Sequence, residues 1–113
     1  METKKYHGKK EQMIEREKEL CKILKTMMDS DANFAKPFSE FWRGCSPSQA
    51  PGAFGLFGLW LSGEGSSKIN GKNVADYYDK ETFEGIKELK NFMKKYELYL
   101  DWYDPGTIMI LFK

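Results

Sequence analysis

The C-terminal segment LYLDWYDPGTIMILFK, residues 98–113, constrains the fold more than any other part of the chain. Apolar residues alternate with others over 98–103, which is the periodicity of a strand with two different faces. The sequence Asp-Pro-Gly at 104–106 then supplies a tight turn, and a second apolar run follows over 107–112. The segment therefore predicts an antiparallel β-hairpin.

Two helices are expected in addition to the hairpin. Apolar residues recur at helical spacing over about 9–28, although Glu17 interrupts their stripe. A second helix is expected over about 80–96, with Asp79 as its cap and with Gly85 inside it at a cost of about 1 kcal/mol relative to alanine. The residues expected to be buried together lie on the apolar side of their elements: Leu24, Met27, Trp60, Ile86, Leu89, Leu100 and Ile110.

The middle of the chain is rich in glycine. Seven of the ten glycines lie within 44–71, interleaved with Phe, Leu and Trp. This pattern predicts a strand over about 53–62 between two flexible loops, because glycine weakens a strand unless a ring or a backbone packs over it. A short helix is expected near Pro37, and the pair Asn70-Gly71 marks a turn. Together these elements predict a small α+β domain, in which a short antiparallel sheet with a C-terminal β-hairpin packs against two main helices.

Length and composition are those of one globular domain. The chain has 113 residues, of which 41% are hydrophobic and 31% are charged. We expect residues 1–8 to form a flexible basic tail and residues 9–113 to form the domain. The sequence shows neither an apolar run of the roughly 18 residues that span a bilayer nor the apolar segment of a signal peptide. We therefore expect a cytoplasmic protein that does not associate with membranes. Cys21 and Cys45 are expected to be reduced, because they make only one possible pair in a chain that needs no disulfide.

The residue types give little support to catalysis. The only histidine is His7, which lies in the expected flexible tail and is therefore a poor base for a Cys or Ser nucleophile. His7 and the two cysteines lack the paired spacing of zinc ligands, and the glycines before Lys68 lack the spacing of a phosphate-binding loop. No catalytic residue, metal or cofactor is therefore expected. A carboxylate- or metal-dependent enzyme stays open as an alternative, because Asp76 and Asp101 have no turn or capping role and lie among aromatic residues.

A protein that binds single-stranded nucleic acid is another alternative. The formal net charge is only +1, so binding to phosphates would depend on a local lysine face. Lys80 and three later lysines have the spacing of one helix face, although Glu84 dilutes its charge, and aromatic residues of the following strand are suited to base stacking. The residues of this interpretation are Lys87, Lys90, Lys94, Tyr99 and Trp102.

Aromatic residues make up 15% of the chain, more than a domain of this size is expected to bury completely. Exposed rings are typical anchors of protein interfaces. The leading hypothesis is therefore a small non-enzymatic module that binds another protein. Its size and its lack of a catalytic pattern are those of regulatory inhibitors of the phage or mobile-element type, which occlude a macromolecular partner. The anchors are expected among five aromatic residues: Phe54, Phe57, Trp60, Tyr77 and Tyr78.

Overall fold

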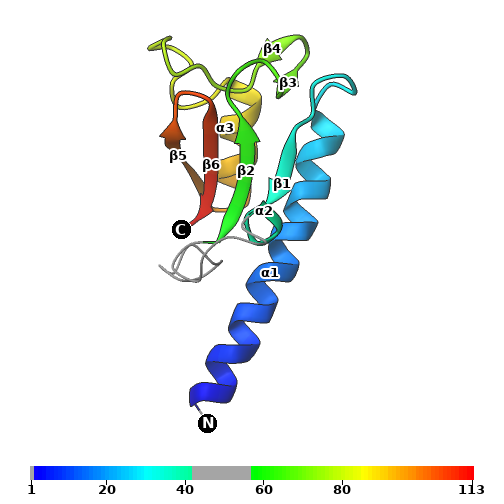
Figure 1. Ribbon diagram of the computed structural model, residues 1–113, viewed down its shortest axis with the longest axis vertical. Coiled ribbons are helices and arrows are strands. Elements are labelled where there is room, and N and C mark those ends of the chain that lie inside the picture. Colours follow the sequence, from blue (N-terminus) through cyan, green and yellow to red (C-terminus); the bar gives the residue numbers. More distant parts are fainter. Residues whose placement is uncertain (1, 42–56) are drawn as a thin grey trace.

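An antiparallel sheet packs against the two main helices, as the sequence predicts. The computed structural model describes residues 2–41 and 57–113, with side chains described for 11–40 and 57–113. In Figure 1, α1 runs along one side of the sheet, and α3 lies behind the sheet, between β6 and β2 in this view. The elements in chain order are α1 (Glu2–Met27), β1 (Ala35–Pro37), α2 (Phe38–Phe41), β2 (Gly58–Ser62), β3 (Lys68–Ile69), β4 (Lys72–Asn73), α3 (Lys87–Lys95), β5 (Leu98–Asp104) and β6 (Thr107–Phe112).

The predicted C-terminal hairpin is present and forms half of the main sheet. The strand order of this sheet is β1-β2-β6-β5, and every neighbouring pair is antiparallel. β1 and β5 are therefore its two edge strands. The pairing of β5 with β6 is regular from Leu98 to Trp102 and shifts register between Trp102 and Asp104. Such a bulge increases the local twist at the end of an edge strand.

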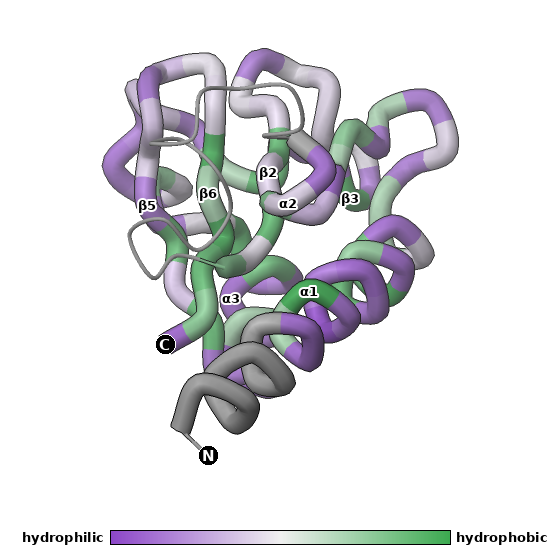
Figure 2. The backbone as a smooth tube through the Cα atoms, turned by 60° about the horizontal axis from the view of Figure 1, so that its bottom comes forward, coloured by the Kyte–Doolittle hydropathy of each residue, from purple (hydrophilic) through white to green (hydrophobic). Residues whose placement is uncertain are grey.

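The two faces of the sheet carry separate apolar clusters, because alternate residues of a strand point in opposite directions. Figure 2 shows hydrophobic positions along β2 and β6, and a mixture of hydrophobic and hydrophilic positions around α1. The main core joins the sheet to both helices: Leu24, Leu59, Leu61, Leu89, Ile108 and Ile110. Leu100 and Met27 pack against this core but are only partly buried.

Trp60 belongs to the smaller cluster on the opposite face, with Phe38 and Leu111. The rings of Trp60 and Phe38 stack with centroids 5.1 Å apart and an interplanar angle of 4°. Trp60 is fully buried, as predicted. The prediction that it lies together with the helix residues is wrong, because it alternates with Leu59 and Leu61 and so faces away from α1 and α3.

The second helix is shorter than predicted. It begins at Lys87 with Ile86 as its N-cap residue, so the prediction of a cap at Asp79 is wrong. Gly85 has φ +105°, which a right-handed helix does not allow, and the helix therefore starts only after it. Residues 77–84 instead form a series of turns. In one of them, Asp79 Oδ1 accepts a hydrogen bond from the backbone N–H of Glu81 at 3.0 Å.

Other element boundaries also differ from the sequence predictions. α1 begins at Glu2, before the expected start near residue 9, while the expected flexibility of residues 1–8 stays a prediction. The short helix expected near Pro37 follows a short strand that ends at that residue. β2 begins at Gly58, and positions 53–56 of the predicted strand lie outside the described residues. In the part of the chain that the structure describes, no helix combines the length and the apolar character needed to cross a membrane.

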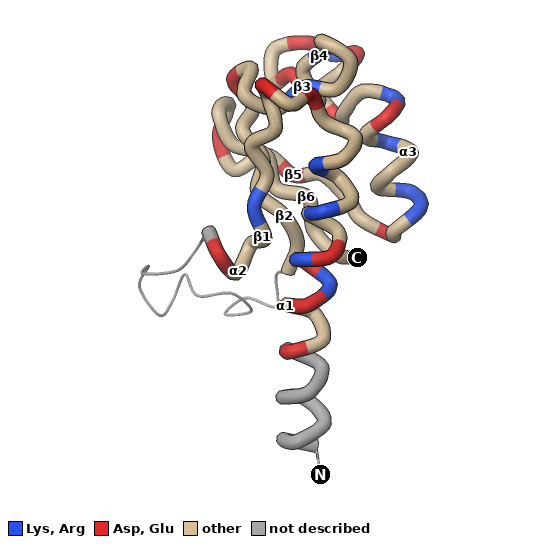
Figure 3. The backbone as a smooth tube through the Cα atoms, turned by 90° about the vertical axis from the view of Figure 1, so that its right-hand side faces the viewer, with Lys and Arg blue, Asp and Glu red and all other residues tan. Residues whose placement is uncertain are grey.

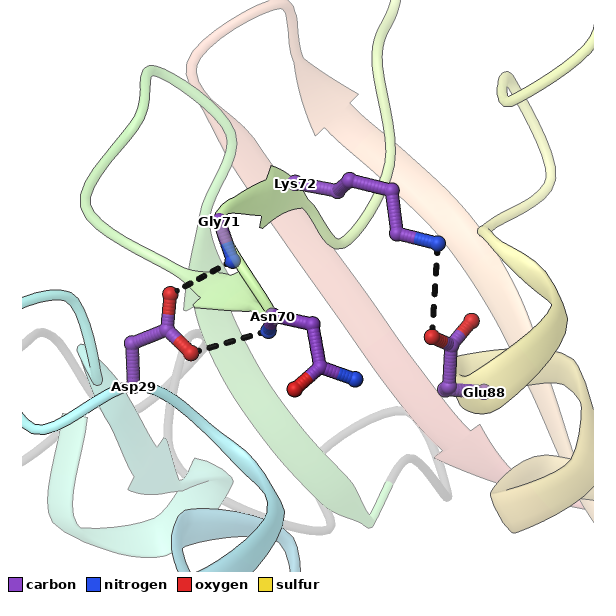
Figure 4. A network of polar contacts seen from close by, with 5 residues as sticks. All are labelled: Asp29, Asn70, Gly71, Lys72 and Glu88. Carbon is purple, nitrogen blue, oxygen red and sulfur yellow. Dashed lines mark hydrogen bonds and ion pairs between the residues drawn. The ribbon is translucent and has the colours of Figure 1, made fainter.

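The predicted Asn70-Gly71 turn is confirmed and connects β3 with β4. Both residues have positive φ angles, 52° and 78°, as the tight turn of a two-residue hairpin requires. The Asp29 carboxylate accepts hydrogen bonds from both of their backbone N–H groups at 2.8 Å (Figure 4). Lys72 Nζ lies 3.3 Å from a carboxylate oxygen of Glu88 and so links this hairpin to α3.

Candidate functional site

Four aromatic side chains from two separate segments meet beside one end of β5. Tyr77, Tyr78 and Phe83 come from the turns before α3, and Trp102 comes from β5 itself. The ring centroid of Tyr77 lies 5.3 Å from those of Tyr78 and Trp102 and 5.5 Å from that of Phe83. We call these four residues the aromatic cluster.

Three rings of the aromatic cluster are exposed to solvent. The exposed fractions are 82% for Tyr78, 39% for Tyr77 and 38% for Phe83, whereas Trp102 is half-buried against the main core. A cavity of about 300 Å³ lies among the exposed rings, and Lys80 and Glu84 complete its lining. Single exposed rings are common on protein surfaces, but a contiguous group is typical of an interaction surface.

Backbone and side-chain contacts hold the aromatic cluster in place. Trp102 Nε1 donates a hydrogen bond to the backbone oxygen of Phe83 at 2.9 Å, which satisfies the only donor of the indole. A Cβ atom on Gly63 would lie 2.8 Å from Cζ3 of Trp102, so glycine leaves the space that this ring occupies. Asp76 Oδ1 accepts a hydrogen bond from Tyr78 N–H at 2.9 Å and fixes the start of the turn. These contacts therefore fix the backbone and the indole ring against which the exposed rings pack.

The five residues expected as anchors lie in different environments. Tyr77 and Tyr78 are exposed in the aromatic cluster, whereas Trp60 is fully buried and Phe57 is half-buried. Phe54 lies outside the described residues. Phe83 falls within the helix predicted over about 80–96, and Trp102 belongs to the nucleic-acid interpretation, so the sequence did not predict that both join the tyrosines. Hydrophobic periodicity does not predict this contact, because the contact joins positions that are far apart in the chain.

A second cavity, of about 480 Å³, lies between α3 and β5. We call it the edge groove. One wall consists of α3 residues and the other of β5 residues: Lys90, Met93, Lys94, Leu98, Tyr99 and Leu100. Glu84, Glu97 and Lys113 complete the lining. Figure 3 shows the basic positions along α3.

The edge groove contains only part of the residue set expected for nucleic-acid binding. Lys90, Lys94 and Tyr99 line it, whereas Trp102 belongs to the aromatic cluster. Lys87 is exposed at the start of α3 and does not line the groove. Lys80 lies in a turn before α3, so the prediction that it shares a helix face with the other lysines is wrong.

The two aspartates of the enzyme alternative have separate surroundings. Asp76 makes the turn contact with Tyr78 N–H. Asp101 is exposed on β5 and, by strand alternation, faces away from the side that carries Trp102. Among the residues with described side chains, no group of three or more His, Cys, Asp and Glu residues is placed to hold a metal ion.

Glu17 is a buried carboxylate whose partners the sequence did not predict. Its side chain has no exposed surface. Oε2 accepts a hydrogen bond from Gly58 N–H at 2.8 Å, and Oε1 accepts one from Ser39 N–H at 3.1 Å. Burial raises the pKa of the Glu17 carboxyl, while these two hydrogen bonds act in the opposite direction. Its hydrogen-bond partners are Ser39 of α2 and Gly58 of β2, and contacts with two other elements point to a structural role.

In comparisons with protein-family models, with curated proteins and with solved structures, nothing matches the chain. The class that the described residues define is a small α+β domain. Its distinguishing features are the aromatic cluster and the edge groove, which lie side by side along β5.

Proposed function

We propose that this chain is a small non-enzymatic module that binds another protein through the aromatic cluster. The supporting observation is that Tyr77, Tyr78 and Phe83 are exposed together on an ordered base. A few rings of this kind supply most of the binding energy in many interfaces. Because they are already in position, little conformational entropy is lost when a partner covers them.

The proposed module acts by covering a surface of its partner. A standard interface buries about 800 Å² on each side, an area that a domain of this size presents easily. A regulatory or inhibitory role then follows if the covered surface is one that the partner needs. The proposed compartment is the cytoplasm, and the free thiol of buried Cys21 supports this proposal.

The test is affinity capture from the source cell with the full chain and three variants. We expect the wild type to capture one stoichiometric protein and Tyr78→Ala to bind it with an affinity lower by about 2 kcal/mol, or roughly 30-fold. Tyr78→Phe should bind as the wild type does, because it keeps the ring. Phe34→Ala is the control for loss of an exposed ring, since Phe34 is 38% exposed but lies outside the aromatic cluster and contacts Lys36 of β1. Equal capture by Tyr78→Ala and wild type would contradict the proposal.

Binding of single-stranded nucleic acid is a second candidate, because Lys90, Lys94 and Tyr99 line one groove. Glu84 and Glu97 in the same lining oppose it. If the groove binds phosphates, affinity for a thymidine oligonucleotide should fall with salt by a log–log slope of roughly 0.7 per phosphate contact. The double variant Lys90→Glu/Lys94→Glu should then abolish binding. An absence of binding at low salt would remove this candidate.

A further inference from the structure

β5 has a partner on one side only. β6 pairs with it, and among the described residues no other strand does. The N–H of Phe112 donates to the oxygen of Phe57 at 2.9 Å and therefore points away from β5. Hydrogen-bonded and non-bonded pairs alternate along an antiparallel ladder, and Leu98 lies opposite Phe112. The backbone N–H and C=O groups of Leu98, and by the same alternation of Leu100 and Trp102, thus face outward from the sheet. Leu98 is only 4% exposed, so the groups open to a further strand are those of half-buried Leu100 and Trp102.

The edge groove runs beside these outward-facing groups. Leu98 and Leu100 line it together with Lys90 and Lys94, which lie one helical turn apart on α3. Glu84 lines both this groove and the cavity of the aromatic cluster, so the two surfaces are continuous.

Charge is distributed unevenly along the helix wall of the groove. Glu84 precedes α3 and Glu97 follows it, whereas Lys90 and Lys94 lie within the helix. The central part of the wall is therefore basic, and its two ends are acidic. A ligand with negative charge opposite the centre fits this arrangement.

We propose that the partner supplies an extended acidic peptide segment that adds to β5 as a further strand; this rests on the proposed protein-binding function and deepens it. The segment's backbone pairs with the outward groups of Leu100 and Trp102, which needs a strand of at least about three residues. Its acidic side chains face Lys90 and Lys94, and an apolar side chain next to them rests on the aromatic cluster.

Two other occupants fit the groove less well. A second copy of this chain, paired edge to edge about a two-fold axis, would bring Lys90 and Lys94 of each copy toward the same lysines of the other. A nucleic acid would place phosphates near Glu84 and Glu97, and it offers no alternating donors and acceptors that match a strand edge.

The test uses a displayed library of random 12-residue peptides, selected against the full wild-type chain. We expect enrichment of acidic peptides that carry an aromatic or aliphatic residue. Synthetic versions should bind the double variant Lys90→Glu/Lys94→Glu at least about tenfold more weakly. Lys87→Glu is the matched control, because Lys87 is on the same helix but outside the groove lining, and its affinity should be unchanged.

Amide hydrogen exchange of the peptide complex gives a readout of strand addition itself. The amides of Leu100 and Trp102 should gain protection, whereas that of Tyr99, which faces β6, should change little. Selected peptides that lose affinity with Tyr78→Ala but leave Leu100 and Trp102 unprotected would overturn strand addition and leave the proposed function standing.

Other results would overturn the inference in ways that identify the true occupant. Failure to enrich any peptide would exclude peptide addition. Binding of a thymidine 12-mer that the double variant abolishes would assign the edge groove to nucleic acid. Protection of Leu100 and Trp102 that grows with protein concentration, without peptide, would assign it to a second copy of the chain.

Discussion

At the scale of single residues, Glu17 connects parts of the fold that are distant in the sequence. It lies on α1 and accepts hydrogen bonds from Ser39, at the start of α2, and from Gly58, the first residue of β2. A buried N–H without an acceptor costs about 1–3 kcal/mol. The two carboxyl oxygens of Glu17 remove this cost at two positions. Glu17 is thus a buried acceptor in the apolar stripe of α1, a role that periodicity does not reveal.

Replacement of Glu17 by glutamine should destabilise the domain by about 1–3 kcal/mol. The amide keeps the shape of the side chain, but its nitrogen donates and leaves one of the two N–H groups without an acceptor. The midpoint and slope of urea unfolding measure this cost. Glu19→Gln, on the exposed side of the same helix, is the control and should leave the midpoint unchanged. Equal midpoints for Glu17→Gln and wild type would show that these contacts contribute nothing.

The stability contributed by Glu17 should depend on pH. Burial raises the pKa of its carboxyl above the ordinary value of 4.5, so the folded chain holds this proton more tightly than the unfolded chain. The contribution is fully present below pH 4.5 and is lost as the pH rises through the raised pKa. The excess stability of wild type over Glu17→Gln should therefore be largest in acid and shrink toward neutral pH. Urea unfolding of both proteins across this range checks it; an excess that grows with pH would contradict the assignment.

At the scale of elements, sequence patterns predicted those helices, strands and turns that depend on residues close together in the chain. The hairpin, the Asn70-Gly71 turn and the helical character of α1 depend on residues adjacent in the chain, and the structure confirms all three. The start of α3 was not predictable in this way. A helical apolar pattern continues through Gly85, and only the three-dimensional structure shows that this glycine has a positive φ.

Replacement of Gly85 by alanine should destabilise the domain by about 1–2 kcal/mol. An alanine at φ +105° is strained, and its Cβ would lie 3.1 Å from Cδ2 of Leu89 in the core. Gly71→Ala is the matched control for crowding, because Gly71 also has a positive φ but nothing lies within 4 Å of its Cβ position. Thermal unfolding should show a larger loss of stability for Gly85→Ala than for Gly71→Ala. A Gly85→Ala variant more stable than the wild type would mean that α3 extends through this position.

The different burial of two of the expected anchors predicts different roles for them. Trp60→Ala should cost about 3–5 kcal/mol of stability, because the side chain is fully buried and stacked on Phe38. Tyr78→Ala should change stability by less than about 0.5 kcal/mol, because 82% of the residue is exposed. Urea unfolding of both variants checks this, and similar losses for the two would contradict the distinction.

At the scale of the whole molecule, both candidate surfaces arise where distant segments meet along β5. The turns before α3 bring Tyr77 and Phe83 to Trp102, and α3 brings Lys90 and Lys94 beside Leu98 and Leu100. Composition indicated that some aromatic residues would be exposed, and helical spacing indicated that several lysines share one face. Neither could indicate which of these residues are neighbours, because that depends on the strand order and on where α3 begins.

The measurement that tests the central claim most directly is an amide hydrogen-exchange footprint of the full chain bound to its captured partner. We expect protection to concentrate in residues 76–84 and in β5, with little change along α1. The free chain gives the reference, and the Tyr78→Ala variant at equal partner concentration should show a weaker footprint in the same segments. Protection confined to α1, with 76–84 unchanged, would contradict the assignment of the aromatic cluster as the binding surface.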